Sequence, residues 1–252
     1  EDRLNIISGA SGIGKSTLLR EYFPQCFDNY IYINQKPMNG NSHSMVATDL
    51  DVFNKIINLF AKHFKQEKTF FSNMSSADGV CPKCLGRGHV TYGSNLQSQI
   101  VLKCQDCRGT GFNKKLQKFE IHGKSLLDIW EMTIDEGYEY FDPVDKEIVE
   151  SLGMAKELLL GHLQIGEKTS DLSGGENIRV KLLRSLDTKY DVYGVDEPFK
   201  GLNNEEIYMV VKILSKLVDQ GKTVVVVDHE ENSFKYFSKH IELKNDAGIL
   251  TE

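Results

Sequence analysis

The chain has 252 residues, a length that suits one large domain carrying a smaller inserted unit. Hydrophobic residues make up 40% and charged residues 26%, which is typical of a folded globular protein and excludes a disordered one. The net charge of -6 excludes a uniformly basic surface.

The sequence predicts neither a membrane span nor a signal peptide. The longest strongly apolar stretch, 223–227, is far shorter than the roughly 20 residues that a membrane span needs. The chain begins Glu1-Asp2-Arg3-Leu4, without an initiating Met or a charged-then-apolar signal pattern. We therefore expect a cytoplasmic protein with no membrane domain, whose natural N-terminus lies upstream.

The first predicted element is a buried strand at 4–8, which leads directly into GASGIGKS at 9–16. This sequence fits the P-loop pattern G-x-x-x-x-G-K-[ST] at every fixed position, and helix-forming residues follow at 17–22. Such a loop lets backbone N–H groups surround a phosphate at a helix N-terminus. Lys15 is expected to reach the β- and γ-phosphates of ATP, and Ser16 to bind Mg²⁺. The predicted nucleotide contacts of the loop are Gly9, Ser11, Gly12, Gly14, Lys15, Ser16 and Thr17.

Two C-x-x-C pairs, Cys81/Cys84 and Cys104/Cys107, have the spacing of a tetrahedral four-cysteine zinc site. Each pair continues as C-x-x-C-x-G-x-G, so glycine turns can present backbone amides to the thiolates. Two disulfides are the alternative, but a cytoplasmic setting and a fifth, unpaired cysteine, Cys26, favour zinc. Four thiolates leave no open coordination position, so the predicted metal is structural. It would order a segment from about 71 to 119 that has little hydrophobic core of its own.

Positive charge is concentrated around these cysteines. From 81 to 124 there are eight basic and two acidic residues, a net charge of +6 that leaves -12 for the remainder. The segment between the pairs, 89–103, is polar and predicts a β-hairpin. It could lie along a phosphate backbone and bind nucleic acid in a salt-sensitive, sequence-independent way. A solvated loop with surplus lysines explains the charge equally well. The basic residues are Lys83, Arg87, Lys103, Arg108, Lys114, Lys115, Lys118 and Lys124.

The sequence LSGGE occupies 172–176. Ser173 and Glu176 match the S-x-x-E capping box, which predicts the start of a helix over 177–186. A serine hydroxyl, two glycine amides and a helix N-terminus also make a good receptor for a γ-phosphate. Ser173, Gly174 and Gly175 are therefore candidate nucleotide contacts.

An acidic strand is predicted at 191–195, ending in Asp196 and Glu197. Asp196 is a candidate Mg²⁺ ligand, and Glu197 a candidate for polarising the attacking water. Taken alone, the pattern also fits a polar turn, because Gly194 interrupts an otherwise apolar run.

The valine-rich run 223–227 predicts a buried parallel strand. His229 follows at its carboxyl end, and that edge of an open α/β sheet faces the ligand. A lone histidine is more often structural than catalytic.

Together, the P-loop, LSGGE and the acidic strand resemble the ATP-binding-cassette (ABC) ATPases. The resemblance implies that Gln35, which follows a predicted strand at 30–33, senses Mg²⁺ and the attacking water; alone it would be interpreted as a surface residue. It also implies that His229 senses the γ-phosphate. ATP would lie between the P-loop of one subunit and residues 173–176 of another, so hydrolysis needs a homodimer or a second ABC half.

With a four-cysteine insertion ahead of LSGGE, the order of motifs is similar to the second nucleotide-binding half of the UvrA family. The similarity covers most of the chain and includes the stretches 34–37, 52–61, 70–72, 123–129, 179–182 and 218–221. It implies ATP-modulated binding of duplex DNA, DNA damage recognition in nucleotide excision repair, and a UvrB-like partner. A UvrA chain has two such halves and a UvrB-binding insertion, whereas this chain has one half.

We therefore expect an α/β fold, a P-loop ABC-type nucleotide-binding domain with an inserted helical signature subdomain. The ATPase core is expected at 1–36 and 171–252, and the subdomain at 37–170, including the zinc module at 71–119. One alternative is an ABC ATPase of drug self-resistance or transport type without DNA binding. Another is a protein-binding zinc-knuckle module, similar to the zinc repeats of DnaJ-type chaperones.

Overall fold

The computed structural model describes residues 3–36, 44–74, 76–93, 100–185 and 190–244. The chain divides into two compact units. The first comprises residues 1–37, 157–159 and 172–252, and the second 38–156 and 160–171. Residue 37, the predicted hairpin tip at 94–99 and the predicted helix end at 186 lie outside the described residues.

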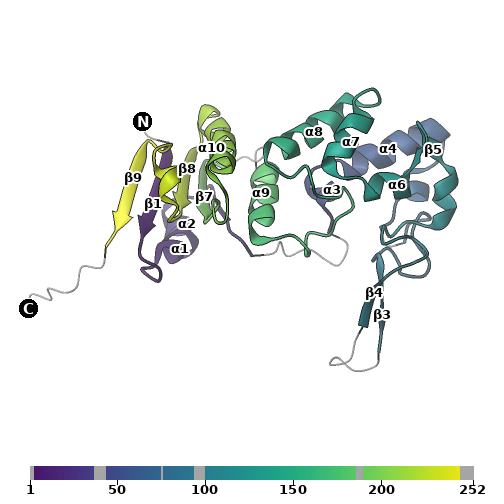
Figure 1. The fold of residues 1–252 in the computed structure, drawn as a ribbon, viewed down its shortest axis with the longest axis horizontal. Coiled ribbons are helices and arrows are strands. Elements are labelled where there is room, and N and C mark those ends of the chain that lie inside the picture. The colour runs from purple at the N-terminus through teal and green to yellow at the C-terminus, as the bar shows by residue number, and fades with distance from the viewer. Residues whose placement is uncertain (1–2, 37–43, 75, 94–99, 186–189, 245–252) are drawn as a thin grey trace, which may run out of the picture. The chain divides into compact units, whose positions relative to one another are not determined.

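A five-stranded, all-parallel sheet forms the centre of the first unit (Figure 1). Its strand order is β2-β7-β8-β1-β9. The strands are β1 (Leu4–Gly9), β2 (Tyr30–Ile33), β7 (Val192–Asp196), β8 (Thr223–Val227) and β9 (Lys239–Leu243). The predicted α/β fold with a parallel sheet is confirmed, and the P-loop, Gln35 and the acidic pair all follow the carboxyl ends of strands.

Helices pack against both faces of this sheet, because alternate residues of a strand point to opposite sides. Ile6 and Val226 pack in one apolar cluster with Leu214, and Ile7 and Val225 in another with the fully buried Leu19. The helical elements are α1 (Lys15–Thr17), the π-helix η1 (Leu18–Tyr22), α2 (Phe23–Cys26), α9 (Gly174–Ser185), α10 (Asn204–Asp219) and α11 (Glu231–Phe234). The helix predicted after the P-loop is thus one continuous helical run with a π turn in it.

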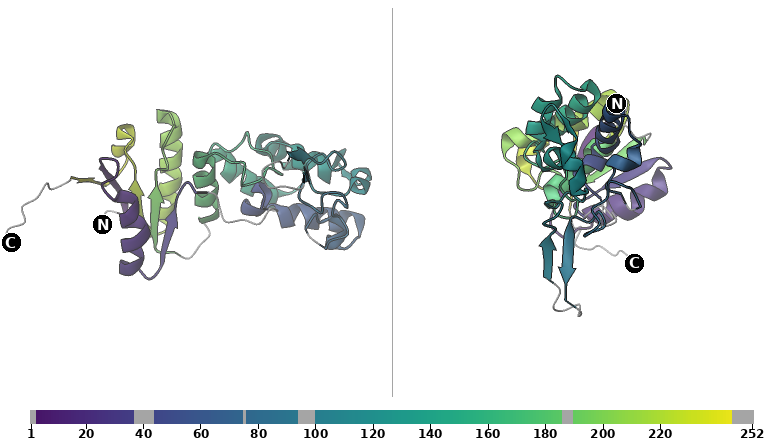
Figure 2. Two further views of the ribbon diagram at one scale, coloured as in Figure 1. Left: turned by 90° about the horizontal axis from the view of Figure 1, so that it is seen from below. Right: turned by 90° about the vertical axis from the view of Figure 1, so that its right-hand side faces the viewer.

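The second unit is mainly helical, with two small antiparallel ribbons, the longer of which extends away from the helices (Figure 2). Its helices are α3 (Val46–Asp49), α4 (Phe53–Phe64), α5 (Lys68–Phe71), the 3-10 helix η2 (Lys114–Lys118), α6 (Leu126–Glu131), α7 (Ile134–Phe141) and α8 (Lys146–Glu157). Its strands are β3 (His89–Tyr92), β4 (Ile100–Lys103), β5 (Glu120–Ile121) and β6 (Lys124–Ser125). No helix in the described ranges is long and apolar enough to cross a membrane.

Aromatic side chains anchor the cysteine-bearing segment in the core of the second unit. Trp130 of α6 meets Phe53 of α4 edge to face, with ring centroids 5.6 Å apart, and Phe112 at 4.7 Å. Phe112, Phe71 and Leu116 are all fully buried. The segment from 71 to 119 therefore contributes its own apolar side chains to a larger core, which its polar composition did not indicate.

Candidate functional site

The loop between β1 and α1 has the backbone of a phosphate-binding loop. Gly9, Gly12 and Gly14 have φ values of 141°, 81° and 99°, a region that glycine adopts without steric cost. The Nζ of Lys15 donates hydrogen bonds to the carbonyls of Gly9 at 2.8 Å and Ala10 at 2.9 Å. The ammonium group thus lies over the loop, and the helix that follows directs its first N–H groups toward the same space.

The acidic strand brings Asp196 to this loop. The Ser16 hydroxyl donates to Asp196 Oδ1 at 3.0 Å, and the Tyr32 hydroxyl donates to Oδ2 at 2.6 Å. Burial, together with the hydrogen bond to Asp196, raises the pKa of Tyr32, so the phenol stays protonated and donating. Two of the predicted Mg²⁺ ligands, Ser16 and Asp196, therefore lie in direct contact.

Gln35 and Glu197 form a second contact at the same edge of the sheet. Gln35 Nε2 lies 3.3 Å from the Glu197 carboxylate and 3.4 Å from its carbonyl. Lys200 Nζ lies 3.4 Å from the same carboxylate. Glu197 has a φ of 52°, a left-handed conformation that is unfavourable for a residue with a side chain and recurs at functional sites.

His229 is placed by its neighbour Asp228. The Asp228 carboxylate is fully buried and accepts three backbone hydrogen bonds, from Phe199 at 3.0 Å, His229 at 2.7 Å and Glu230 at 3.0 Å. Burial raises the pKa of Asp228 in spite of these donors. The imidazole of His229 is 61% exposed, and in the described part of the chain it makes no hydrogen bond to Glu197 or Gln35.

The LSGGE segment forms the predicted cap of α9. Glu176 Oε2 accepts from the Ser173 N–H at 2.7 Å, and the Glu176 N–H donates to Ser173 Oγ at 3.3 Å. The Gln35 side chain lies beside Gly174, so a Cβ there would stand 3.1 Å from Gln35 Oε1. The glycine keeps the first turn of α9 accessible and close to the glutamine.

The four predicted zinc ligands converge in the second unit. The sulfur atoms of Cys81, Cys84, Cys104 and Cys107 all lie within 4.8 Å of one another. Cys81 and Cys104 are separated by 3.9 Å, and Cys84 and Cys107 by 3.6 Å. A tetrahedral zinc site with Zn–S bonds of about 2.3 Å requires sulfur separations of roughly 3.8 Å, whereas a disulfide requires about 2.05 Å. All four side chains are buried and free of disulfides, so the donor set fits zinc.

The two knuckles repeat one backbone design. Gly88 N–H donates to Cys84 Sγ and Gly111 N–H to Cys107 Sγ, each at 3.3 Å. Each knuckle also bonds to the other, because Cys104 N–H donates to the Gly88 carbonyl and Cys81 N–H to the Gly111 carbonyl. Burial raises the pKa of the Cys84 and Cys107 thiols; that of Cys104 is lowered, since hydrogen bonds outweigh its burial.

Sequence reasoning missed Tyr32, which donates to Asp196, and Asp228, which accepts from the backbone of Phe199, His229 and Glu230. Tyr32 carries no motif, but its strand β2 pairs with β7, where Tyr32 lies opposite Gly194. Asp228 was visible as a carboxylate directly after a run of four valines, a position where a charge needs several partners.

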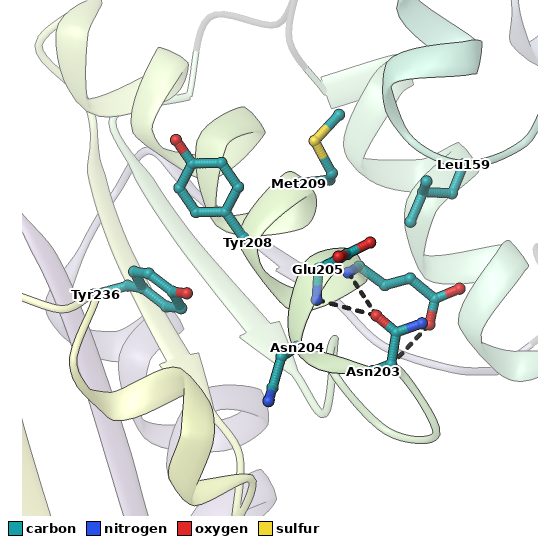
Figure 3. A pocket seen from close by; sticks show the side chains of 8 residues that line it. Leu159, Asn203, Asn204, Glu205, Tyr208, Met209 and Tyr236 are labelled. Carbon is teal, nitrogen blue, oxygen red and sulfur yellow. Dashed lines mark hydrogen bonds between the residues drawn. The ribbon is translucent and has the colours of Figure 1, made fainter.

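A separate pocket of about 610 Å³ lies beside the start of α10 (Figure 3). None of its lining residues belongs to the predicted nucleotide or metal set. Asn203 caps the helix there, accepting from the N–H groups of Glu205 at 2.9 Å and Glu206 at 3.0 Å. The lining consists of Leu159, Asn203, Asn204, Glu205, Glu206, Tyr208, Met209 and Tyr236.

Comparison with known proteins agrees with this geometry. The family model for "ABC transporter" matches residues 1–200. "UvrABC system protein A" of Aquifex aeolicus is 30% identical over an alignment of 272 positions, which covers 96% of this chain and 29% of that protein. The Borreliella burgdorferi protein of the same name is 31% identical over an alignment of 274 positions, which covers 97% of this chain and 29% of that protein.

The crystal structure of UvrA2 from Deinococcus radiodurans matches with a TM-score of 0.79 and 29% identity over 91% of this chain and 31% of that one. The chain therefore spans less than a third of the length of these relatives. The family-model match, the relatives and the solved structure confirm the resemblance to ABC ATPases and to UvrA that the motifs indicated. The chain belongs to the ABC family of ATPases, and over most of its length it is similar to UvrA proteins.

Proposed function

We propose that this chain is one nucleotide-binding half of a UvrA-like protein that hydrolyses ATP and binds duplex DNA. The observation that carries the proposal is the assembly of P-loop, Asp196 and Glu197 at one edge of the sheet, in a chain similar to UvrA over 96% of its length. DNA damage recognition in nucleotide excision repair, a UvrB-like partner and a cytoplasmic location follow from that similarity as parts of the proposal.

Each side chain of the nucleotide site has a proposed role. Lys15 would exchange its carbonyl acceptors for β- and γ-phosphate oxygens, while Ser16 and Asp196, with Gln35, would hold Mg²⁺. When bound, Mg²⁺ would neutralise phosphate charge. Glu197 would accept a proton from the attacking water, and His229 would contact the γ-phosphate. Backbone contacts to the phosphates would come from Gly9, Ser11, Gly12, Gly14 and Thr17.

Completion of the site requires a second half. Ser173, Gly174 and Gly175 at the N-terminus of α9 would bind the γ-phosphate held by a facing P-loop, because helix N–H groups and the helix dipole favour negative charge. The facing half is a second copy of this chain or another ABC half. A monomer would then bind ATP but hydrolyse it slowly.

The zinc knuckles have a structural role in this proposal. Cys81, Cys84, Cys104 and Cys107 would hold one Zn²⁺, with the Gly88 and Gly111 amides stabilising thiolate charge. We also propose that 71–119 acts as the zinc module of an inserted subdomain at 37–170, within a core formed by 1–36 and 171–252.

The test is binding of a labelled 30-base-pair duplex, intact or carrying a bulky lesion, across a salt series. The protein is measured with ATP, with ADP, and as Glu197→Gln, which would trap an ATP-bound dimer. We expect DNA binding that depends on the nucleotide and is weakened by salt. We also expect the rate of ATP hydrolysis per chain to rise with protein concentration, because the active form is a dimer. ATP hydrolysis without DNA binding in any state would refute the DNA half of the proposal and favour a transport or self-resistance ATPase, or a protein-binding zinc module.

A further inference from the structure

Of the four basic residues between 81 and 111, Lys83, Lys103 and Arg108 are paired with acidic neighbours, and Arg87 donates to the Cys84 carbonyl at 3.1 Å. Lys83 Nζ lies 3.1 Å from Asp106, and Lys103 Nζ lies 3.9 Å from Glu131. Arg108 contacts Asp128 at 2.8 Å and also Glu131 at 3.3 Å. Most of the positive charge that the sequence concentrates around the knuckles is therefore compensated there in the folded protein.

Five other lysines of the second unit have different surroundings. In the described parts of the chain, none of them has a carboxylate within ion-pair distance, and all five side chains are exposed. They lie in two segments, 65–68 and 114–120, which also contain Glu67 and Glu120, so the net charge of the two segments together is +3. We call this the five-lysine surface: Lys65, Lys68, Lys114, Lys115 and Lys118.

An aromatic cluster brings these lysines together from two distant parts of the sequence. Phe119 meets Phe64 with ring centroids 5.1 Å apart and Phe70 at 5.3 Å, so the end of α4 and helix α5 lie against η2. Lys115 Nζ lies over the Phe70 ring at 5.1 Å, and Lys118 Nζ near the Phe119 ring at 5.3 Å. These cation–π contacts restrain both side chains while leaving their N–H groups accessible, which lowers the entropy cost of binding an anion.

We propose that the five-lysine surface binds the backbone phosphates of duplex DNA, and that the basic residues of the zinc knuckles contribute little to the affinity. The inference rests on the proposed DNA binding and says where its electrostatic part resides. Lysine contacts to phosphates position a duplex without reading its sequence. Binding through this surface is therefore the same for any sequence and strongly weakened by salt.

The experiment measures how the logarithm of the binding constant for a 30-base-pair duplex changes with the logarithm of salt concentration. The test variant is Lys114→Gln/Lys115→Gln/Lys118→Gln, and the matched control is Lys83→Gln/Lys103→Gln/Lys156→Gln. Both variants remove three positive charges, but the control lysines are ion-paired, Lys156 with Asp135 at 3.1 Å. Each lost phosphate contact lowers the slope by about 0.9, so the test variant should lose roughly two to three and the control less than about one.

Zinc content and the thermal unfolding midpoint confirm that both variants are folded, and Lys65→Gln/Lys68→Gln repeats the test from the other side of the aromatic cluster. An unchanged slope in both test variants, or an equal loss in the control, would overturn the inference while leaving DNA binding intact. Displacement by polyglutamate as effectively as by duplex would also overturn it and indicate an acidic protein partner. Absence of wild-type binding to DNA would overturn both proposals.

Discussion

Ser16 and Asp196 meet at the edge of a sheet whose strands pack in apolar clusters on both faces, whereas the four cysteines meet almost without an apolar core of their own. In the first unit Ile6, Val195 and Val226 are fully buried under α10. In the second, Val90 is the one hydrophobic residue outside the cysteines that packs against the sulfur cluster in the described ranges. The sheet can thus form without a ligand, while the knuckles depend on a metal to offset the cost of ordering them.

The largest effect is therefore expected from removing zinc. Chelation should release one Zn²⁺ per chain and abolish hydrogen-exchange protection of the Gly88 and Gly111 amides, because their acceptors are the thiolates. Zinc binding of this kind contributes on the order of 10 kcal/mol to local folding. ATP binding by the P-loop should persist.

Two cysteine variants sharpen this prediction. Cys107→Ser should reproduce the effect of chelation, while Cys26→Ser, at an exposed thiol of the first unit, should leave metal content and exchange unchanged. Purified protein that contains no zinc and does not respond to chelation would contradict the assignment.

The knuckle glycines should show the next largest effect. Gly88 has a φ of 73°, and a Cβ there would overlap the carbonyl oxygen of Gly109 in the other knuckle. Gly88→Ala should therefore separate the knuckles and weaken zinc binding about 10- to 100-fold in a chelator competition. Gly123 has a similar φ of 76° but nothing within 4 Å of its Cβ position.

Gly123→Ala is thus a control with the same backbone strain and no overlap. It should cost about 1–2 kcal/mol of stability and leave zinc affinity unchanged. Equal zinc affinities for the two variants would show that the close approach of the knuckles is unimportant.

A site could be predicted from the sequence where its residues lie close together along the chain. The P-loop, LSGGE and the two C-x-x-C pairs each lie within a few residues, and local spacing alone indicates their chemistry. The hairpin 89–103 could also be predicted, and its described ends form β3 and β4 with His89 opposite Lys103.

The remaining contacts depend on which strands are neighbours, and strand order in a parallel sheet is not local information. Tyr32 reaches Asp196 because β2 lies beside β7, although 164 positions separate the two residues. The balance of charge at the knuckles is similarly non-local, since Glu131 and Asp128, which pair with Arg108, come from α6. Composition counts charges along a segment and cannot show which of them fold against opposite charges.

Gly194 is a second position explained by strand order. It interrupts the acidic strand because Tyr30 crosses it from β2: a Cβ at Gly194 would overlap the Tyr30 hydroxyl, which donates to the Leu19 carbonyl at 2.7 Å. Gly194→Ala should destabilise the first unit by about 1–3 kcal/mol in denaturant unfolding. Zinc affinity in the second unit should not change.

A double-mutant cycle tests the stated cause. In a Tyr30→Ala background the overlap is absent, so Gly194→Ala should cost less than about 0.5 kcal/mol, giving a coupling of about 1 kcal/mol or more. Additive effects of the two substitutions would mean that Tyr30 is not the reason for the glycine.

The smallest effect is expected where apolar packing already dominates. Asn203 caps α10, and Glu206 completes the box by accepting from the Asn203 N–H at 2.8 Å. Asn203→Ala should cost about 1 kcal/mol of unfolding free energy, and Asn203→Asp, which keeps an acceptor and adds negative charge at the helix N-terminus, should cost little. The loss stays small because Ile207, Val210 and Leu214 remain buried against the sheet. A loss from Asn203→Ala of more than about 2 kcal/mol, the upper end for a lost helix cap, would mean that α10 depends on its cap more than on this packing, and that the sheet unit is less self-sufficient than its apolar core indicates.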